Sequence, residues 1–220
     1  MGKFNLKDYL PKKHNWFIWL NTLFIIVLLS IGKTTPFVIV IAFFLETVII
    51  GIVQIFKLAT TISYHKKNTK PQPKYNNYSM VLFFIFHYGF FIAVQLVFVF
   101  ALLQFGENHF EAFDLINNIK YAMSMKGMNL VLSSILLFNF IDYYINHIWA
   151  KGYEKQTVDI LFMQPYKRIF IQQFAVILGS FFMIFNFAMT IVALLIIAIK
   201  TFIDLNFIAN PEKNIFSKKI

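Results

Sequence analysis

A single carboxylate in the middle of an apolar stretch is the residue best placed for chemistry in this sequence. Glu46 lies inside the run PFVIVIAFFLETVIIGIVQIFK, which extends from Pro36 to Lys57 and is long enough to cross a bilayer. A charge near the bilayer midplane costs roughly 2.5 kcal/mol or more, so Glu46 must be neutral, paired or turned toward a polar interior. Gln54 and Lys57 fall on the same helical face, and we expect this polar stripe to face other helices.

Polar residues interrupt the later apolar runs as well, within the stretches FHYGFFIAVQ, FNFIDYYINH and FIQQF. Each polar group in hydrocarbon needs a hydrogen-bond partner, so we expect these groups to share one polar core that binds a small ligand or a proton or serves assembly. In the alternative reading, Glu46 is a protonated structural carboxyl bonded to a neighbouring helix and does no chemistry. The candidate core comprises Glu46, Gln54, His87, Tyr88, Gln95, Asn139, Asp142, Tyr143 and Gln173.

A divalent metal is the first alternative use of this core. Glu46 and His87 supply two ligands of suitable chemistry, and Asp142 or His147 would supply a third if its depth allows. The spacings HExxH and HxxxH are absent, as are GxSxG and glycine-rich phosphate loops. The sequence therefore disfavours an enzyme. A small transporter stays open, although the chain shows no clear internal repeat.

A second set of charges lies near the ends of the apolar runs. We expect these side chains to reach the headgroups at the cytoplasmic face or to pair there. One such pair, Lys200 and Asp204, has the i, i+4 spacing of neighbours on a helix. The set comprises Lys57, Arg168, Lys200 and Asp204.

The composition indicates an integral membrane protein. Of 220 residues, 59% are hydrophobic and only 14% are charged, against about 25% in soluble domains. The net charge of +10 fits lipid headgroups better than nucleic acid, because the basic residues lie between apolar runs and the 29 Phe mostly within them. There is no Cys, which excludes disulfides and thiolate metal sites.

Six apolar runs of spanning or nearly spanning length are expected to form helices of an all-α membrane bundle. The basic N-terminus (1–15) and tail (209–220) would flank a transmembrane domain over 16–208, with a solvated linker from His65 to Ser79. The runs are Trp16–Ile31, Pro36–Lys57, Met80–Phe105, Met128–Trp149, Ile169 to about Phe185, and about Ala188 to Leu205.

The distribution of basic residues predicts the topology. Fifteen Lys and Arg lie on the side of the termini and three on the other side, which places both termini in the cytoplasm. The composition suggests a bacterial protein of the inner membrane. The outer segment 106–127 has apolar residues at helical spacing among acidic ones, so we expect a short amphipathic helix that lies on lipid or caps the bundle.

Four motifs resemble a family of polytopic prokaryotic membrane proteins, the domain of unknown function 6498. They are, in order, ETVIIGIVQIFK, FHYGFF, FMQPYKRI and IKTFIDL, spread over residues 36–206. The resemblance implies His in the family where this chain has Gln95, Asn139 and Gln173. Amides are poor transition-metal ligands, so a His-rich metal centre of the family would be lost or altered here. The lipid bilayer is the expected partner of the apolar surface. A second copy of this chain, in a homo-oligomer, or another membrane protein is also compatible with it.

Overall fold

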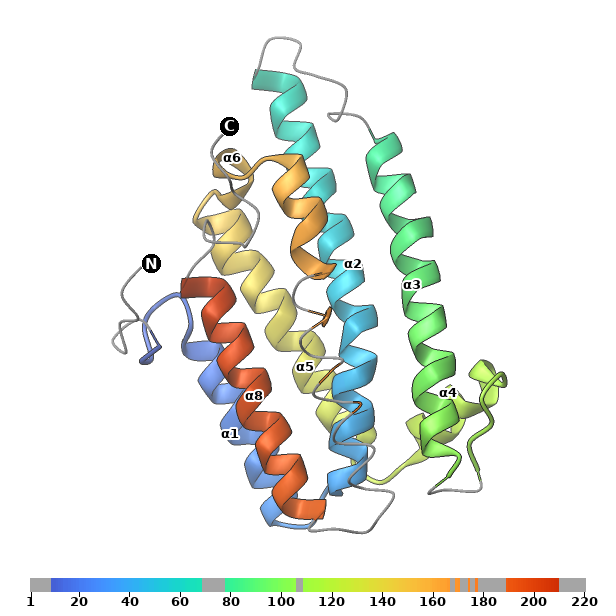
Figure 1. Cartoon of the computed structure of the whole chain (residues 1–220). Helices are drawn as coiled ribbons and strands as arrows, with labels where there is room; N and C mark the ends of the chain where they lie inside the picture. The colour runs from blue at the N-terminus through green and yellow to red at the C-terminus, as the bar shows by residue number, and fades with distance from the viewer. Residues whose placement is uncertain are drawn as a thin grey trace.

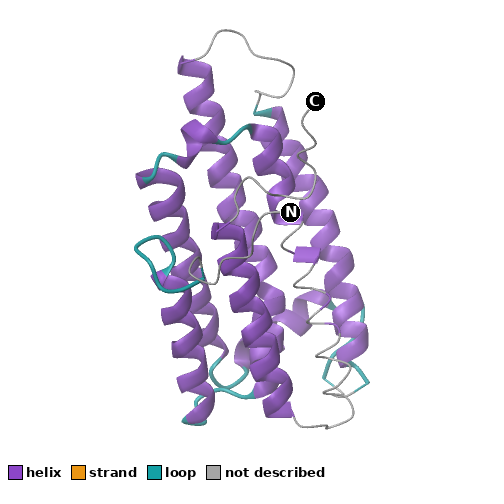
Figure 2. Cartoon of the chain, turned by 60° about the vertical axis from the view of Figure 1, so that its left-hand side comes forward, coloured by secondary structure: helices purple, strands orange, loops and turns teal. Residues whose placement is uncertain are grey.

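The computed structural model describes residues 9–68, 78–105, 109–166, 169–170, 174, 177 and 189–209. Within this part of the chain the structure is helical apart from turns and short loops, and the long helices run side by side (Figure 1, Figure 2). The predicted all-α class is therefore confirmed.

Helix α2, Pro36–Asn68, is the central element of the bundle and contacts α3, α5, α6 and α8. It is apolar all round over its first three turns, as a helix surrounded by others must be. The predicted end at Lys57 is wrong, because the helix continues for three more turns and buries Leu58, Thr61 and Ile62 at helical spacing. Part of the expected linker is thus helix.

Helix α3, Ser79–Leu103, packs on one side of α2 and leaves much of its apolar surface exposed. The two helices approach closely at Gly51, where a Cβ would overlap the ring of Tyr88. The short helix expected within residues 106–127 is α4, Leu115–Ser124, and Asp114 caps it by accepting a hydrogen bond from the backbone N–H of Asn117.

Helix α5, Met128–Asp142, continues without a break into a π-helical segment, η2, Tyr143–Trp149. A short helix α6, Gly152–Lys155, follows after Lys151, whose backbone is left-handed at φ 54°. Residues 158–166 are helical again. We expected a loop here, but Val158 and Leu161 are buried one turn apart, so this segment packs as a helix.

Helix α1, Trp16–Ser30, and helix α8, Met189–Ala209, lie side by side and complete the described bundle. Their contact includes a 2.7 Å hydrogen bond between the hydroxyls of Thr22 and Thr201. The predicted fifth spanning helix, Ile169 to about Phe185, falls almost entirely outside the described residues.

Four helices of the described chain are long and apolar enough to cross a membrane: α2, α3, α8, and α5 together with η2. Helix α1 is equally apolar but shorter, with 15 residues. These helices indicate a multi-pass membrane protein.

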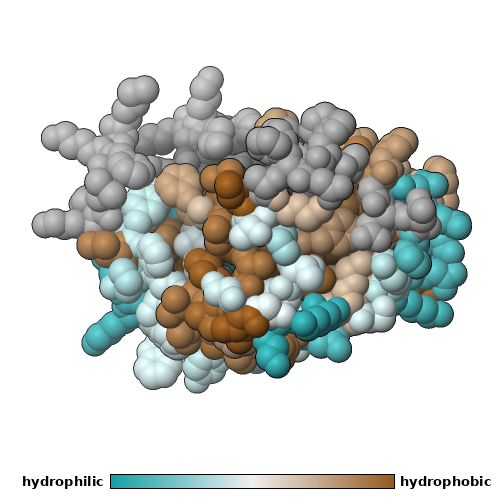
Figure 3. All heavy atoms as spheres, turned by 90° about the horizontal axis from the view of Figure 1, so that it is seen from below, coloured by the Kyte–Doolittle hydropathy of each residue, from teal (hydrophilic) through white to brown (hydrophobic). Residues whose placement is uncertain are grey.

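The bundle has two chemically different ends. At one end α1 begins and α2, η2 and α8 end, close to α6 (Figure 1). We call this the basic end, because Lys66, Lys67, Lys151 and Lys155 lie there. Helix α4 lies at the opposite end (Figure 1). When the molecule is viewed from below, the surface on the side of α4 is hydrophilic (Figure 3).

Candidate functional site

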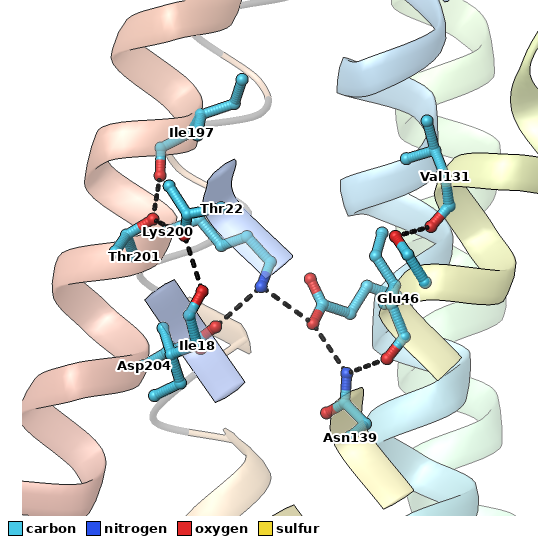
Figure 4. Close-up of polar contacts among 11 residues, drawn as sticks. Ile18, Thr22, Glu46, Val131, Asn139, Ile197, Lys200, Thr201 and Asp204 are labelled. Atoms are coloured by element: carbon cyan, nitrogen blue, oxygen red, sulfur yellow. Dashed lines mark hydrogen bonds and ion pairs between the residues drawn. The ribbon is translucent and has the colours of Figure 1, made fainter. Parts of the chain in front are cut away.

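A buried cluster of charged side chains joins α2 to α8. The ammonium of Lys200 lies 3.3 Å from Oε1 of Glu46 and 2.7 Å from Oδ2 of Asp204 (Figure 4). Glu46 is completely buried and Lys200 is 7% exposed. We expected Lys200 and Asp204 to reach the headgroups or to pair; the two do pair, and the Lys200 ammonium also contacts Glu46.

Helix α5 supplies the neutral member of this cluster. The side-chain amide of Asn139 donates to Oε1 of Glu46 at 3.0 Å and to the backbone carbonyl of Ile135 at 2.9 Å. The second bond is made within α5 itself, so it fixes the orientation of the amide that faces Glu46. One carboxylate oxygen thus accepts from residues of two helices (Figure 4).

Local sequence explains how these groups reach one place. Lys200 and Asp204 lie one turn apart on α8, and Thr201 between them bonds to Thr22 of α1 and to its own helix. The polar face of α8 therefore meets α1 and α2 together. Because the surroundings are apolar, each charge depends on these partners for its stability.

A second ion pair lies closer to the basic end. The ammonium of Lys57 is 3.1 Å from Oδ2 of Asp142, and both side chains are largely buried. Oδ1 of Asp142 accepts a 2.8 Å hydrogen bond from the amide of Asn146, which also donates to the carbonyl of His14. This pair joins α2 to the junction of α5 and η2.

The π-helix decides which residues of η2 face α2. A π-turn contains about one residue more than an α-turn, so Asp142 and His147, five positions apart, can share a face. His147 is buried and its Nε2 lies 2.9 Å from the hydroxyl of Thr60 on α2. Tyr143 is half-buried and its ring stacks on that of His147.

One cavity of about 570 Å³ is lined by Lys200 and Asp204, by the pair of Lys57 and Asp142, and by Asn139 and His147. It extends from His14, Lys155 and Ile208 at the basic end to Asn139 and Lys200 at its inner end. Its walls combine apolar side chains with charges and amides, an arrangement typical of small-molecule sites. The charged and polar lining residues are His14, Asn21, Gln54, Lys57, Asn139, Asp142, Asn146, His147, Lys155, Gln156, Gln164, Lys200 and Asp204.

Two side-chain amide oxygens of the cavity wall have no hydrogen-bond partner among the described residues. Asn21 on α1 is 5% exposed, and its Oδ1 makes no hydrogen bond to the described residues; the same is true of Oε1 of Gln164. Gln54, by contrast, donates to the carbonyl of Leu161. Buried polar atoms are nearly always bonded, so the oxygens of Asn21 and Gln164 are available to accept hydrogen bonds from a molecule or a water in the cavity.

The candidate core residues on α3 lie apart from this cavity. His87 is exposed and its Nδ1 is 2.7 Å from the hydroxyl of Tyr166, while Tyr88 donates to the carbonyl of Thr47. Gln95 is half-buried and, among the described residues, its Oε1 has no partner. Gln173 and Arg168 lie outside the described residues.

The proposed metal ligands are not brought together. Glu46 has Asn139 and Lys200 as partners, whereas His87 bonds to Tyr166. Within the described part of the chain, no three His, Cys, Asp or Glu side chains are grouped as metal ligands would be. The arrangement of this part of the core is that of ion pairs and amides.

Sequence reasoning missed Asn21, Thr60 and Gln164. Asn21, with Thr22 beside it, interrupts the apolar run from Trp16 to Ile31, and an amide within a spanning run was the available signal. Thr60 and Gln164 fell in stretches that we expected to be outside the helices.

Comparison with known proteins agrees with the motifs. The family model of a family of unknown function (DUF6498) matches residues 6–218, nearly the whole chain. The chain belongs to this family. Neither the comparison with curated proteins nor the comparison with solved structures gave a match. The buried cluster and the cavity therefore have to be interpreted from their own chemistry.

Proposed function

We propose that this member of the DUF6498 family is a six-helix protein of the bacterial inner membrane that binds a small polar molecule in the cavity at its basic end. The observation that carries the proposal is the cavity of about 570 Å³ with the unpartnered oxygen of Asn21 in its wall. A volume of this size lies within the range of small-molecule sites.

The count of six spans adds α1 and the segment after Ile169 to the four long apolar helices. The distribution of basic residues supports a cytoplasmic location of both termini, since fifteen of the eighteen Lys and Arg outside the apolar runs fall on the side of the termini. The cavity would then open toward the cytoplasm, because its outer lining residues belong to the basic end.

The polar groups inside the bundle also support a binding function. Amides and ion pairs inside a membrane protein are costly, so they are retained mostly where they have a function. Glu46 and Lys200 form an ion pair with each other, and a core with a purely structural role would need no further polar groups. Asn21 and Gln164 are not satisfied by the described protein, and a bound molecule would supply the missing donors.

Cysteine accessibility tests the proposal, and the chain is suited to it because it contains no Cys. Asn21→Cys places a thiol in the cavity wall, whereas Leu23→Cys, two residues away, places it on the outward apolar face. Lys126→Cys, next to the start of α5, marks the opposite end. Each variant is treated with a membrane-impermeant thiol reagent in right-side-out and in inside-out vesicles.

We expect Asn21→Cys to react in inside-out vesicles, Lys126→Cys to react in right-side-out vesicles, and Leu23→Cys to react in neither. A thiol at position 21 that reacts no faster than the thiol at position 23 would refute a water-accessible cavity. Reaction of positions 21 and 126 from the same side would refute the topology.

A further inference from the structure

Side-chain amides are the commonest polar groups in the cavity wall. They come from α1, α2, α5, η2 and the segment between α6 and residue 166, so they surround the cavity on several sides. Polar groups inside a membrane bundle are costly and are retained mostly where they have a function. The amides are Asn21, Gln54, Asn139, Asn146, Gln156 and Gln164.

Hydrogen bonds to the protein fix the orientation of three of these amides. The NH₂ group of Asn139 donates to the carboxylate of Glu46 and to the backbone carbonyl of Ile135 (Figure 4). The NH₂ group of Gln54 donates to the backbone carbonyl of Leu161. Carboxylate and carbonyl oxygens only accept, so the opposite orientation of either amide would place oxygen against oxygen.

This orientation leaves the amide oxygens as acceptors without a donor. The NH₂ group of Asn146 is engaged in the same way, with a backbone carbonyl and a carboxylate. Asn21 is 5% exposed, and its oxygen is buried. The cavity wall therefore offers several acceptors that call for O–H or N–H donors. Across the part of the chain that the structure describes, no donor reaches the side-chain oxygens of Asn21, Gln54, Asn139, Asn146 and Gln164.

Four charged side chains of the wall are engaged with one another. The ammonium of Lys57 lies 3.1 Å from the carboxylate of Asp142, and that of Lys200 lies 2.7 Å from the carboxylate of Asp204. A ligand with a full charge would compete with these pairs or be buried against amides, which carry no charge. An uncharged hydroxyl or N–H group meets the amide oxygens without this cost.

We propose, on the basis of the proposed function, that the ligand of this cavity is an uncharged molecule with several O–H or N–H donors. The side-chain oxygens of Asn21, Gln54 and Asn139 accept hydrogen bonds from it. Apolar residues of the wall, Phe17 and Phe138 among them, cover its carbon skeleton. A polyol and a small carboxamide both have this chemistry.

Protection of a thiol in the cavity wall tests the proposal. Ile18→Cys places the thiol one turn from Asn21 on α1, and Val53→Cys provides a second position on α2. Each full-length variant is purified in a detergent without a sugar head group. Its reaction with a small water-soluble thiol reagent is then timed in the presence of mannitol or malonamide.

A bound probe excludes the reagent, so the rate constant should fall as the probe is added, by about tenfold at ten times its Kd. A fall with mannitol alone indicates a ligand with hydroxyl donors, and a fall with malonamide alone indicates one with amide donors. Either result supports the proposal. Lys126→Cys, at the other end of the bundle, is the control for direct effects of the probes on the reagent, and its rate should not change.

A second substitution connects the protection to an amide of the wall. Asn21→Leu, added to Ile18→Cys, removes one acceptor at nearly constant size and should abolish most of the protection. Asn129→Leu makes the same change at an exposed residue of α5 and should leave it intact. Equal protection in both double variants would overturn the proposal. So would protection by methylammonium or acetate with none by either uncharged probe.

The outcome can be separated from that of the proposed function. If the thiols at positions 18 and 53 react but neither uncharged probe slows them, the cavity is open to water and the proposal of an uncharged donor ligand is wrong. If neither thiol reacts with the reagent, the cavity is closed and the proposed function fails as well.

Discussion

Replacement of Lys200 by Met tests the buried cluster most sharply. The variant keeps most of the side-chain volume and removes the ammonium that lies 3.3 Å from Glu46 and 2.7 Å from Asp204. Two carboxylates then remain at the inner end of the cavity. Glu46 retains the amide of Asn139, which provides a hydrogen bond but no charge.

The size of the effect follows from the burial of the pair. Removing one partner of a buried ion pair costs about 3–5 kcal/mol, and here a single ammonium serves two carboxylates, which favours the upper part of the range. For a chain of this size, such a loss corresponds to a Tm lower by roughly 6–20 °C.

Thermal unfolding in detergent, followed by circular dichroism, measures this change. Lys126→Met is the matched control, because Lys126 is exposed at the other end and its replacement should alter stability by no more than about 0.5 kcal/mol. The double variant Glu46→Gln with Lys200→Met should recover part of the loss, since it removes one of the two carboxylates that lose the Lys200 ammonium. If Lys200→Met unfolds within about 1 kcal/mol of the wild type, the cluster does not hold α2 and α8 together as described.

Three further predictions, with four substitutions, follow from the packing around α2 and α3, and each is measured by the same unfolding assay. Tyr88→Phe deletes the buried 2.7 Å hydrogen bond to the carbonyl of Thr47 and should cost about 1 kcal/mol, so an unchanged Tm would contradict that bond. Gly51→Ala should destabilise because its Cβ meets the Tyr88 ring, whereas Gly89→Ala has free space and should be neutral or stabilising by up to about 1 kcal/mol; equal effects would contradict the close approach. Gln95→Leu removes a buried oxygen without a described partner and should not destabilise, so a loss above about 1 kcal/mol would reveal a partner for it.

Much of the fold could be predicted because its determinants are local. Apolar length placed helices at 16–31, 36–57, 80–105, 128–149 and 188–205, and the described helices lie there with shifted ends. The predicted helix ends were wrong where helix formation depends on tertiary contacts. The apolar run ends at Lys57 and a linker was expected from His65, yet the helix continues to Asn68, and Leu58 and Ile62 are buried by neighbouring elements.

The site was harder to predict, because it depends on which helices meet. The i, i+4 spacing showed that Lys200 and Asp204 are neighbours, but no spacing within α8 indicates that Lys200 also reaches Glu46 on α2. The sequence likewise suggested His87 as a partner of Glu46, since both lie in spanning runs. In the structure, α3 directs His87 to Tyr166 instead. The π-helix that brings His147 to Thr60 has no counterpart in a 3.6-residue pattern.

The most direct test of the account is to identify what the cavity holds. The wild-type protein, Asn21→Phe and Leu23→Phe would be purified from membranes in parallel and extracted, and the small molecules compared by mass spectrometry. Asn21→Phe fills part of the cavity, whereas Leu23→Phe makes the same change on the outward face. We predict a molecule that copurifies with the wild type and Leu23→Phe in equal amounts and is depleted from Asn21→Phe. Identical extracts from all three proteins would contradict a ligand site in this cavity.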